Sequence, residues 1–536
     1  MIGIVQPDNV VQFRAIPYAT LPARFKQSVL LDRLPEGKTD FTKPGFACPH
    51  IFGADIFSGG PRPDEPPLQS SEFSSLILQL NAPLSTLQSL QADKDGNTPA
   101  KLPVMVYIHG GGFVLGKIDQ NHNAAYMVEH SIATAQPVIG ISIQYRVGAL
   151  GFLGTPDGGR NFGLYDQRNA LAWVRRFVGG FGGDAGRTTA WGESAGAMSI
   201  CFHMLMRPPP GGPLFDRVIL MSGVLGPLGT PVRRREAEET YEKALKILEI
   251  KERGEEGLEK ARSVEVERIH VISNALTDEG GIWLPIEDEM LPYFSWEDIP
   301  RLLGECDWVN DIVLGTTGFE GLTMLNNANA MTPSTFLDGI AKQLGDSAAA
   351  TIAEAYNVTR TMDQNLFLTS AMRWIGDVVF DGKTYPTILI FLTISNIPSP
   401  KRVYRYVFDV GNPFPNHTLY QLPHHWVDVY FVFRSLQFRY PSQRLKMISD
   451  QHASYWIDFG NGNAPWTEYK HSGDGKEIIA VAELRDGWVE RTVAEDERVT
   501  ELSWKRVEKL YDAWSAAKGS QFRPLSIDPL LKKRFV

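Results

Sequence analysis

Short apolar runs rich in β-branched residues alternate along the chain with stretches of helical spacing. The runs that predict strands are Val104–Ile108, Val138–Tyr145, Thr188–Trp191, Val218–Met221, Asp311–Gly315 and Val403–Phe408. Between the second and third runs, Leu171, Val174 and Val178 recur on one face of a helix, so 163–178 is predicted to be an amphipathic crossover helix. The βαβ alternation predicts an α/β fold with a mostly parallel central sheet flanked by helices.

Two long intervals interrupt this alternation. Residues 233–269 are dense in charged side chains with leucines between them, and residues 332–374 show further helical spacing. We expect a single domain, 1–536, that carries helical insertions at approximately 224–305 and 322–400. These insertions are expected to cover the edge of the sheet as a lid or gorge over a site.

Composition excludes several classes of protein. Hydrophobic residues make up 43% of the 536 residues and charged residues 21%, which is ordinary for a globular protein and excludes wholesale disorder. The formal charge of −9 is spread without basic or acidic blocks, so neither a nucleic acid nor an anionic membrane surface is expected as a partner. The apolar runs are too short to span a bilayer. A small-molecule substrate remains the favoured partner, and the sequence does not predict an oligomeric state.

The strongest chemical signal is the G-E-S-A-G pattern at 192–196. It follows a predicted strand directly and precedes the helix-compatible stretch 195–206. A serine on such a tight strand-to-helix turn has its hydroxyl raised above the sheet, and the flanking glycines allow neighbouring backbone to pass closely. Ser194 is therefore the predicted nucleophile.

A second glycine-rich segment, His109-Gly-Gly-Gly-Phe113, follows the first predicted strand. Its backbone N–H groups, together with that of Ala195, can point at the oxygen that becomes negative during acyl transfer. Phosphate binding is the competing interpretation of a glycine run. It is weaker here because neither G-x-G-x-x-G nor a following G-K-[ST] occurs.

A nucleophilic serine needs a base and a carboxylate that orients the base. We prefer His425 over the neighbouring His424, and Glu320, which follows the predicted strand 311–315. The order serine, acid, histidine is then that of α/β-hydrolases. Other carboxylates stay open at this point, namely Glu305, Asp307, Asp311 and Asp428, and the last of these is close enough in sequence to His425 to be a supporting partner.

With these motifs in hand, the chain closely resembles the type-B carboxylesterase/lipase family, the branch of α/β-hydrolases that includes cholinesterases and the non-catalytic neuroligins. The matching segments are 13–19, 47–49, 109–113, 145–146, 151–153, 161–167, 181–184, 192–196, 222–223, 320–321, 425 with 431–433, and 456–463. The resemblance implies the triad Ser194, Glu320 and His425, with Gly111, Gly112 and Ala195 as the oxyanion hole. It also places Glu193 beside the site and Ser222 behind the triad carboxylate.

The same resemblance implies a gorge lined by aromatic side chains: Phe113, Trp283, Phe319 and Phe433. Aromatic walls favour uncharged, apolar or aromatic esters. We therefore expect a serine carboxylic-ester hydrolase that acts through an acyl-enzyme, with no cofactor and no metal. The alternatives are an acyltransferase, lactonase or thioesterase acting on a specialised metabolite; a non-catalytic adhesion module like the neuroligins is disfavoured.

Several departures from the family pattern matter. The family pairs the cysteine matching Cys48 with a second cysteine, and Ser75 stands in that second place. The lost disulfide and the absence of a signal-peptide pattern at the start favour a cytoplasmic location, with secretion as the alternative if a leader was removed. Sequons at Asn357 and Asn416 would fit secretion. Segment 49–75 contains no tryptophan, so quaternary-ammonium substrates are not expected.

Overall fold

The computed structural model describes residues 1–50, 68–92, 100–226, 229–278, 283–381, 401–499 and 504–516. Its main element is an eleven-stranded sheet in the order β1-β2-β7-β9-β8-β10-β11-β12-β13-β14-β15. The middle strands are parallel, and six of them are the predicted runs: β9 (Ile139–Ile143), β8 (Leu102–Ile108), β10 (Gly183–Glu193), β11 (Arg217–Met221), β12 (Asp311–Thr317) and β13 (Arg402–Asp409). The α/β prediction is confirmed.

Antiparallel strands complete both edges of this sheet, and the sequence pattern did not predict them. One edge of the sheet carries β1 (Ile4–Val5), β2 (Val10–Pro17) and β7 (Ile77–Pro83). At the other edge, β14 (Ile478–Glu483) is parallel to β13, and the last strand, β15 (Gly487–Thr492), is antiparallel to β14. Two further pairs form small separate sheets: β3 (Ala19–Thr20) with β4 (Val29–Leu30), and β5 (Phe46–Ala47) with β6 (Gln69–Ser70). Edge pairing depends on contacts distant in sequence, which the βαβ rhythm does not encode.

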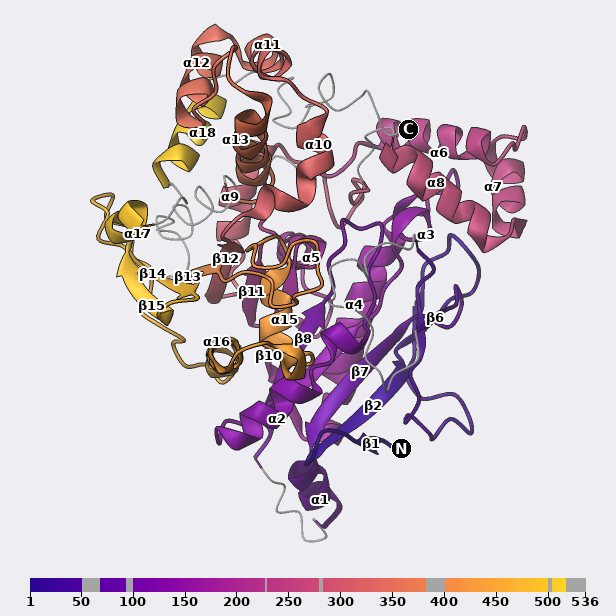
Figure 1. Ribbon diagram of the computed structural model, residues 1–536. Helices are drawn as coiled ribbons and strands as arrows, with labels where there is room; N and C mark the ends of the chain where they lie inside the picture. The colour runs from indigo at the N-terminus through magenta and orange to yellow at the C-terminus, as the bar shows by residue number, and fades with distance from the viewer. Residues whose placement is uncertain are drawn as a thin grey trace.

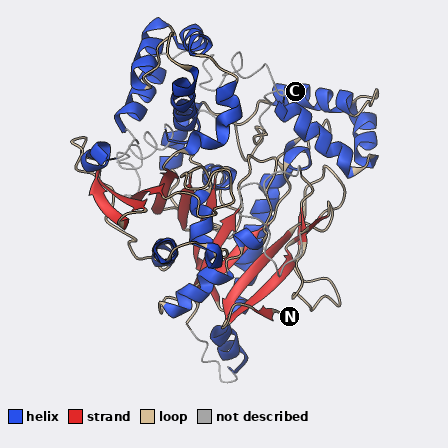
Figure 2. Cartoon of the chain, viewed as in Figure 1, coloured by secondary structure: helices blue, strands red, loops and turns tan. Residues whose placement is uncertain are grey.

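The sheet separates two hydrophobic cores. In β8, Val104 and Ile108 belong to one core, whereas Met105 and Tyr107 belong to the other, as the alternation of side chains along a strand requires. Helices α4 (Phe162–Phe177) and α5 (Ala195–Leu205) pack into the first core, and α2 (Ala125–Ala133) and α16 (Gln443–Gly460) into the second. Figure 2 shows the strands running through the molecule with helices around them.

Two groups of helices stand above one end of the sheet, on the right and left of Figure 1. They arise from the two predicted insertion intervals. The group on the right contains α6 (Arg234–Ile247), α7 (Gly254–Ser263) and α8 (Val266–Asp278), and the group on the left contains α10 (Leu325–Asn329), α11 (Pro333–Leu344), α12 (Asp346–Ala355) and α13 (Gln364–Gly376). Helix α9 (Ile299–Gly304) comes from the first interval but lies below α13 in this view. The second group shares its own core with α18 (Trp504–Ala516).

Shorter elements connect these parts. They are α1 (Leu84–Ala92), α3 (Gly148–Phe152), α15 (Val427–Phe433) and α17 (Val493–Val499), with single turns at η2 (Gln120–His122), η5 (Glu320–Met324) and η6 (Asp377–Asp381). Within the described ranges, no helix has the length and apolarity needed to cross a bilayer.

A buried ion pair joins the crossover helix to the loop after β9. Arg146 and Asp166 are almost completely buried, and Nε and Nη2 of the arginine donate to the two carboxylate oxygens of the aspartate at 2.7 and 2.8 Å. The Ser28 hydroxyl donates to Asp166 at 2.6 Å, and Arg146 also donates to the carbonyl of Lys26. Loss of either charge would leave the other buried and uncompensated.

We predict that Asp166→Asn lowers the free energy of unfolding by about 3–5 kcal/mol, because it leaves the buried Arg146 charge without an oppositely charged partner. Urea denaturation monitored by circular dichroism measures this change. The control is Arg235→Gln, which breaks a pair with Glu239 in which both side chains are exposed and which is expected to contribute nothing measurable. Equal stability of the two variants would contradict the structural role of the buried pair.

Candidate active site

Ser194 lies at a strained turn between β10 and α5. Its backbone has φ of 56° and ψ of −124°, and its amide donates to the carbonyl of Met221 at 2.9 Å. The carbonyl of Ile108 passes so close that a Cβ on Gly192 would lie 2.7 Å from it, and a Cβ on Gly196 would overlap it. The two glycines of the motif are therefore required by the approach of β8, and the nucleophile position is held by the sheet itself.

The glycine loop after β8 turns beside this serine. Gly111 and Gly112 have φ of 106° and 61°, a region that side chains rarely adopt, and the Gly111 carbonyl accepts from the amides of Val114 and Leu115. In the described part of the chain, the amides of Gly111 and Gly112 donate to no protein acceptor. The amide of Ala195 opens helix α5, where the first N–H groups have no partner within the helix. The N–H groups expected to form the oxyanion hole are therefore not used in hydrogen bonds within the described protein.

His109 anchors the start of the same loop. Its ring stacks on Tyr145 with centroids 4.2 Å apart, Nδ1 lies 2.9 Å from the Gly110 carbonyl, and the Tyr145 hydroxyl donates to the His109 carbonyl. Burial lowers the pKa of His109 to about 3. The residue is a neutral structural support for the glycine loop.

Glu320 lies immediately after β12 and contacts His425. Nδ1 of His425 donates to Oε2 of Glu320 at 2.6 Å, and Oε1 accepts from the Ser222 hydroxyl at 2.5 Å and the Thr317 amide at 2.6 Å. Both carboxylate oxygens are therefore engaged, and Glu320 is held in one orientation. Ser222, which the resemblance placed behind the triad acid, donates directly to it.

Backbone pairing holds the loops of Glu320 and His425 together. The amide of Phe319 donates to the carbonyl of Pro423 at 2.9 Å, and Phe319 forms a parallel bridge with His424. A Cβ on Gly321 would overlap the Met372 carbonyl of helix α13, so the glycine after the acid is needed for the helix to pack here. The second helical group thereby supports the acid.

The structure brings His425, and not His424, to the carboxylate. His424 is fully buried; its Nδ1 donates to the carbonyl of His425 at 2.5 Å, and its Nε2 lies 2.9 Å from the Asn412 amide nitrogen. Burial lowers the pKa of His424 to about 4, so it is neutral at physiological pH. Both ring nitrogens of His424 are therefore used in contacts that fix the conformation of the loop before His425.

A second carboxylate faces the other nitrogen of His425. Oε1 of Glu193 lies 3.0 Å from Nε2. Burial alone would lower the pKa of His425, but the charges of Glu193 and Glu320 outweigh it and raise this pKa well above the usual value. Burial in turn raises the pKa of Glu193. The arrangement stabilises an imidazolium, the form that the histidine of a catalytic triad takes after it accepts the serine proton.

The Ser194 hydroxyl has no hydrogen bond to His425 among the described residues, because Nε2 is directed at Glu193 in this conformation. Catalytic hydrogen bonds are often absent in substrate-free enzymes and form when substrate binds. Transfer of the serine proton therefore requires Nε2 to turn from Glu193 towards Ser194.

The competing carboxylates lie elsewhere. Asp311 begins β12, at the far end of the strand from Glu320, and pairs with Arg402 at 2.6 Å; Glu305 pairs with Arg301 on the surface. Asp428 is fully buried and accepts from the Tyr406 hydroxyl at 2.9 Å. Burial, followed by the charges of Glu193 and Glu320, raises the pKa of Asp428 to about 8, so it is mainly a neutral acid at pH 7.

A cavity of about 290 Å³ opens above Ser194. The described side chains on its apolar part are Leu115, Met324, Phe380 and Trp426, and the polar part carries His109, Lys117, Asp119, Asn121 and His122. Asp119 lies 4.0 Å from Lys117 and 3.2 Å from His122, so the charges of this wall are paired with each other.

None of the four predicted gorge aromatics is among the described residues that line this cavity. The positive φ at Phe113 turns its ring into the core, where it packs against Phe152 with centroids 5.0 Å apart. Phe433 packs against Trp191 and Tyr107 in the opposite core. Phe319 lies under the Arg373 guanidinium, and Trp283 is buried with its N–H donated to Thr277. The gorge prediction is therefore corrected.

Phe380 and Trp426 are the aromatics that replace the predicted set. Phe380 comes from the turn η6 and stacks on the His425 ring, with centroids 4.2 Å apart. Trp426, next to His425 in the sequence, has φ of 76° and lines the cavity. Its position beside His425 was a usable signal in the sequence. No signal in the sequence indicated Phe380, because it lies 45 residues before His425 and contacts the histidine ring only in the folded protein.

The described side chains do not form a metal site or a disulfide. No cluster of three or more histidine, cysteine or acidic side chains in the described ranges could hold a metal ion. Cys48, Cys201 and Cys306 are all buried free thiols, and Ser75 is buried at the position expected for a cysteine.

Comparison with known proteins assigns this architecture. The family model described as "Carboxylesterase family" matches residues 3–499. Lipase 3 of Yarrowia lipolytica is 26% identical over 525 residues, which cover 95% of this chain and 96% of that protein. A secreted triacylglycerol lipase of Gibberella zeae is 33% identical over 261 residues, 44% of this chain and 42% of that protein.

Solved structures share the fold. A PNB esterase superimposes with a TM-score of 0.70 at 24% identity, covering 95% of this chain and 97% of that one. A thermophilic PNB esterase gives the same TM-score, identity and coverage. The α/β-hydrolase fold expected from the sequence is thus confirmed.

We predict that Glu320→Gln keeps the fold but lowers turnover by roughly 10³–10⁴, because an amide cannot stabilise the imidazolium of His425. Asp428→Asn is the matched control: it replaces a buried and mainly neutral carboxyl with an amide of the same shape, so a much smaller loss is expected. Kinetics with one chromogenic ester, with circular dichroism to verify folding, compare the two. The reverse ranking would assign the acid to Asp428.

A second prediction concerns the pH dependence of kcat/KM. With His425 as the predicted base, activity requires its neutral form, so the rate is expected to fall as the pH drops through the pKa of this histidine. Because Glu193 raises that pKa, Glu193→Gln is expected to move the acid limb of the profile to lower pH. Asp119→Asn serves as the control, since Asp119 interacts with His122 rather than His425. An acid limb that stays in place in Glu193→Gln would show that Glu193 does not act on the base.

Proposed function

The chain belongs to the carboxylesterase family, and we propose that it is a serine ester hydrolase with Ser194 as nucleophile, His425 as base and Glu320 as the orienting acid. The observation that carries this assignment is the 2.6 Å hydrogen bond from His425 to Glu320 beside the strained turn at Ser194. The related proteins are named as lipases and esterases, which supports hydrolysis rather than transfer or a non-catalytic role.

In the proposed reaction, Nε2 of His425 takes the Ser194 proton as the serine oxygen attacks the ester carbonyl. Glu320 and Glu193 stabilise the resulting imidazolium from its two sides. The amides of Gly111, Gly112 and Ala195 hold the oxyanion, and His425 then gives its proton to the departing alcohol. Water, activated by the same histidine, releases the acid and restores the serine.

The cavity supports uncharged esters as substrates. Its apolar contacts come from Leu115, Met324, Phe380 and Trp426, while Lys117 and Asp119 compensate each other and leave no unpaired charge for an ionic group. A volume of about 290 Å³ suits an ester with one apolar or aromatic substituent on either side of the carbonyl. The cytoplasmic location expected from Ser75 stays a prediction, since the relative in Gibberella zeae is titled as secreted.

The test is covalent labelling. We expect a fluorophosphonate to modify Ser194, and Ser194→Ala to lose labelling and at least about 10³-fold in ester turnover. The control is Ser199→Ala, which alters a buried serine one turn further along α5 whose hydroxyl donates to the Ala195 carbonyl. Product analysis with and without added alcohols separates hydrolysis from acyl transfer. An adduct on another serine would refute the assignment.

A further inference from the structure

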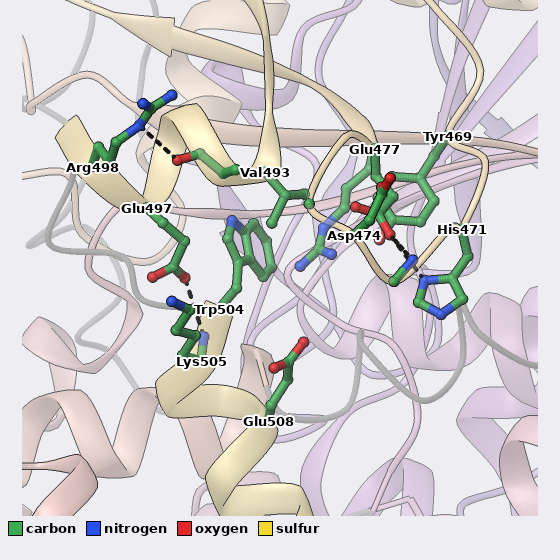
Figure 3. Close-up of a pocket in the computed structure, with 14 residues that line it drawn as sticks. Tyr469, His471, Asp474, Glu477, Val493, Glu497, Arg498, Trp504, Lys505 and Glu508 are labelled. Carbon is green, nitrogen blue, oxygen red and sulfur yellow. Dashed lines mark hydrogen bonds and ion pairs between the residues drawn. The ribbon is translucent and has the colours of Figure 1, made fainter.

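A second and larger cavity lies beside β13, away from Ser194. Its volume is about 640 Å³. The described residues that line it belong to β13, to the segment around β14, and to α17 and α18: Arg405, Tyr469, His471, Gly473, Asp474, Gly475, Glu477, Val493, Ala494, Glu497, Arg498, Trp504, Lys505 and Glu508. Figure 3 shows the Trp504 indole in the middle of this group, with Glu497 on one side and Tyr469 and Glu477 on the other.

Arg405 is the unusual member of this set. It lies in the middle of β13, the third strand from one edge of the sheet, and only 2% of the residue is exposed. Its guanidinium lies over the Trp504 ring, 3.2 Å from the centroid, and 5.8 Å from that of Tyr469. The aromatic faces attract the cation, and the Tyr469 side chain forms a hydrogen bond with it, but neither supplies the opposite charge that a buried guanidinium usually has.

Arg405 has no ion pair with any carboxylate in the described part of the chain. The two acidic groups that act on it from a greater distance are Asp381 and Asp496. Burial and the charges of Asp377 and Glu320 raise the pKa of Asp381 well above its usual value, which favours its neutral form. Asp496 has its own cation, Arg491, at 3.7 Å. No carboxylate in the described part of the chain contacts the guanidinium of Arg405, and burying a cation without such a contact is costly.

Three of the four acidic side chains described around the cavity have other partners: Asp474, Glu477 and Glu497. Glu477 accepts from the amides of Ser472 and Gly473 at 3.0 and 2.6 Å and pairs with His471. These contacts lower its pKa against the opposing effect of burial. The Lys505 amide donates to Glu497 at 3.1 Å. The positive charge at the base of the cavity therefore remains open to a ligand.

We propose that this cavity is a binding site for a small molecule that carries one carboxylate on an apolar or aromatic body. The planar guanidinium of Arg405 would bind the carboxylate through two parallel hydrogen bonds. Trp504 and Val493 would contact the apolar part of the ligand. Glu497 and Glu508 on the walls repel further negative charge, so a monocarboxylate fits better than a dianion such as phosphate.

Benzoate is the probe, with acetate and inorganic phosphate for comparison, in titration calorimetry at constant ionic strength. Benzoate is expected to bind more tightly than either of the other two. Arg405→Gln is expected to weaken benzoate binding at least about tenfold, and Arg405→Lys to weaken it less, because lysine keeps the charge but not the paired donors. The control is Arg498→Gln on the same cavity, whose guanidinium donates to the Ala494 carbonyl and which should bind benzoate as the wild type does.

Thermal unfolding supplies a second readout. Benzoate should raise the Tm of the wild type and of Arg498→Gln but not of Arg405→Gln, while the ligand-free Arg405→Gln protein should be no less stable than the wild type, because it loses an unpaired buried charge. Failure of the wild type to bind benzoate would overturn the proposal. So would benzoate binding that Arg405→Gln leaves unchanged, which would place the ligand elsewhere, including above Ser194.

Discussion

The approach of strand β8 to the turn at Ser194 is the constraint on which the site depends. The carbonyl of Ile108 occupies the space where a side chain on Gly192 or Gly196 would lie, so β8, β10 and the start of α5 meet without side chains between them. This close packing sets the positive φ of the serine and places the glycine loop after β8 beside it. One backbone contact thus positions both Ser194, the proposed nucleophile, and the proposed oxyanion donors.

Charge burial is the second organising factor. The low dielectric of the interior strengthens the interaction of His425 with Glu320 and Glu193, and it also raises the pKa of Asp428 towards neutrality. Three acidic groups near one histidine therefore have different roles. Glu320 is fixed by Ser222 and Thr317, Glu193 faces the other nitrogen, and Asp428 bonds to a tyrosine. The role of each acidic group thus depends on its distance from His425 and on its hydrogen-bond partners, and not on whether it is an aspartate or a glutamate.

The helical groups connect this site to the rest of the chain. The turn η6, next to α13, places Phe380 on the ring of His425, and the Met372 carbonyl of α13 explains the glycine that follows Glu320. Helix α18 packs against the same helical group, where Arg506 pairs with Asp377 of η6, and it covers Arg405 with Trp504. One sheet strand, β13, thus has the active-site histidine loop after its end and a separate buried cation at its centre.

The sequence by itself determined the parallel strands, the crossover helix and the identity of the triad candidates, because these features are local: periodicity, a strand followed by a glycine turn, and chain order. It did not determine the antiparallel edges or the cavity walls. The four predicted aromatics are near the motifs in sequence, yet the positive φ at Phe113 and the packing of Phe433 on Trp191 turn both rings into the cores. Which side chain faces a cavity depends on backbone rotation and on partners distant in sequence, and only the tertiary structure decides these.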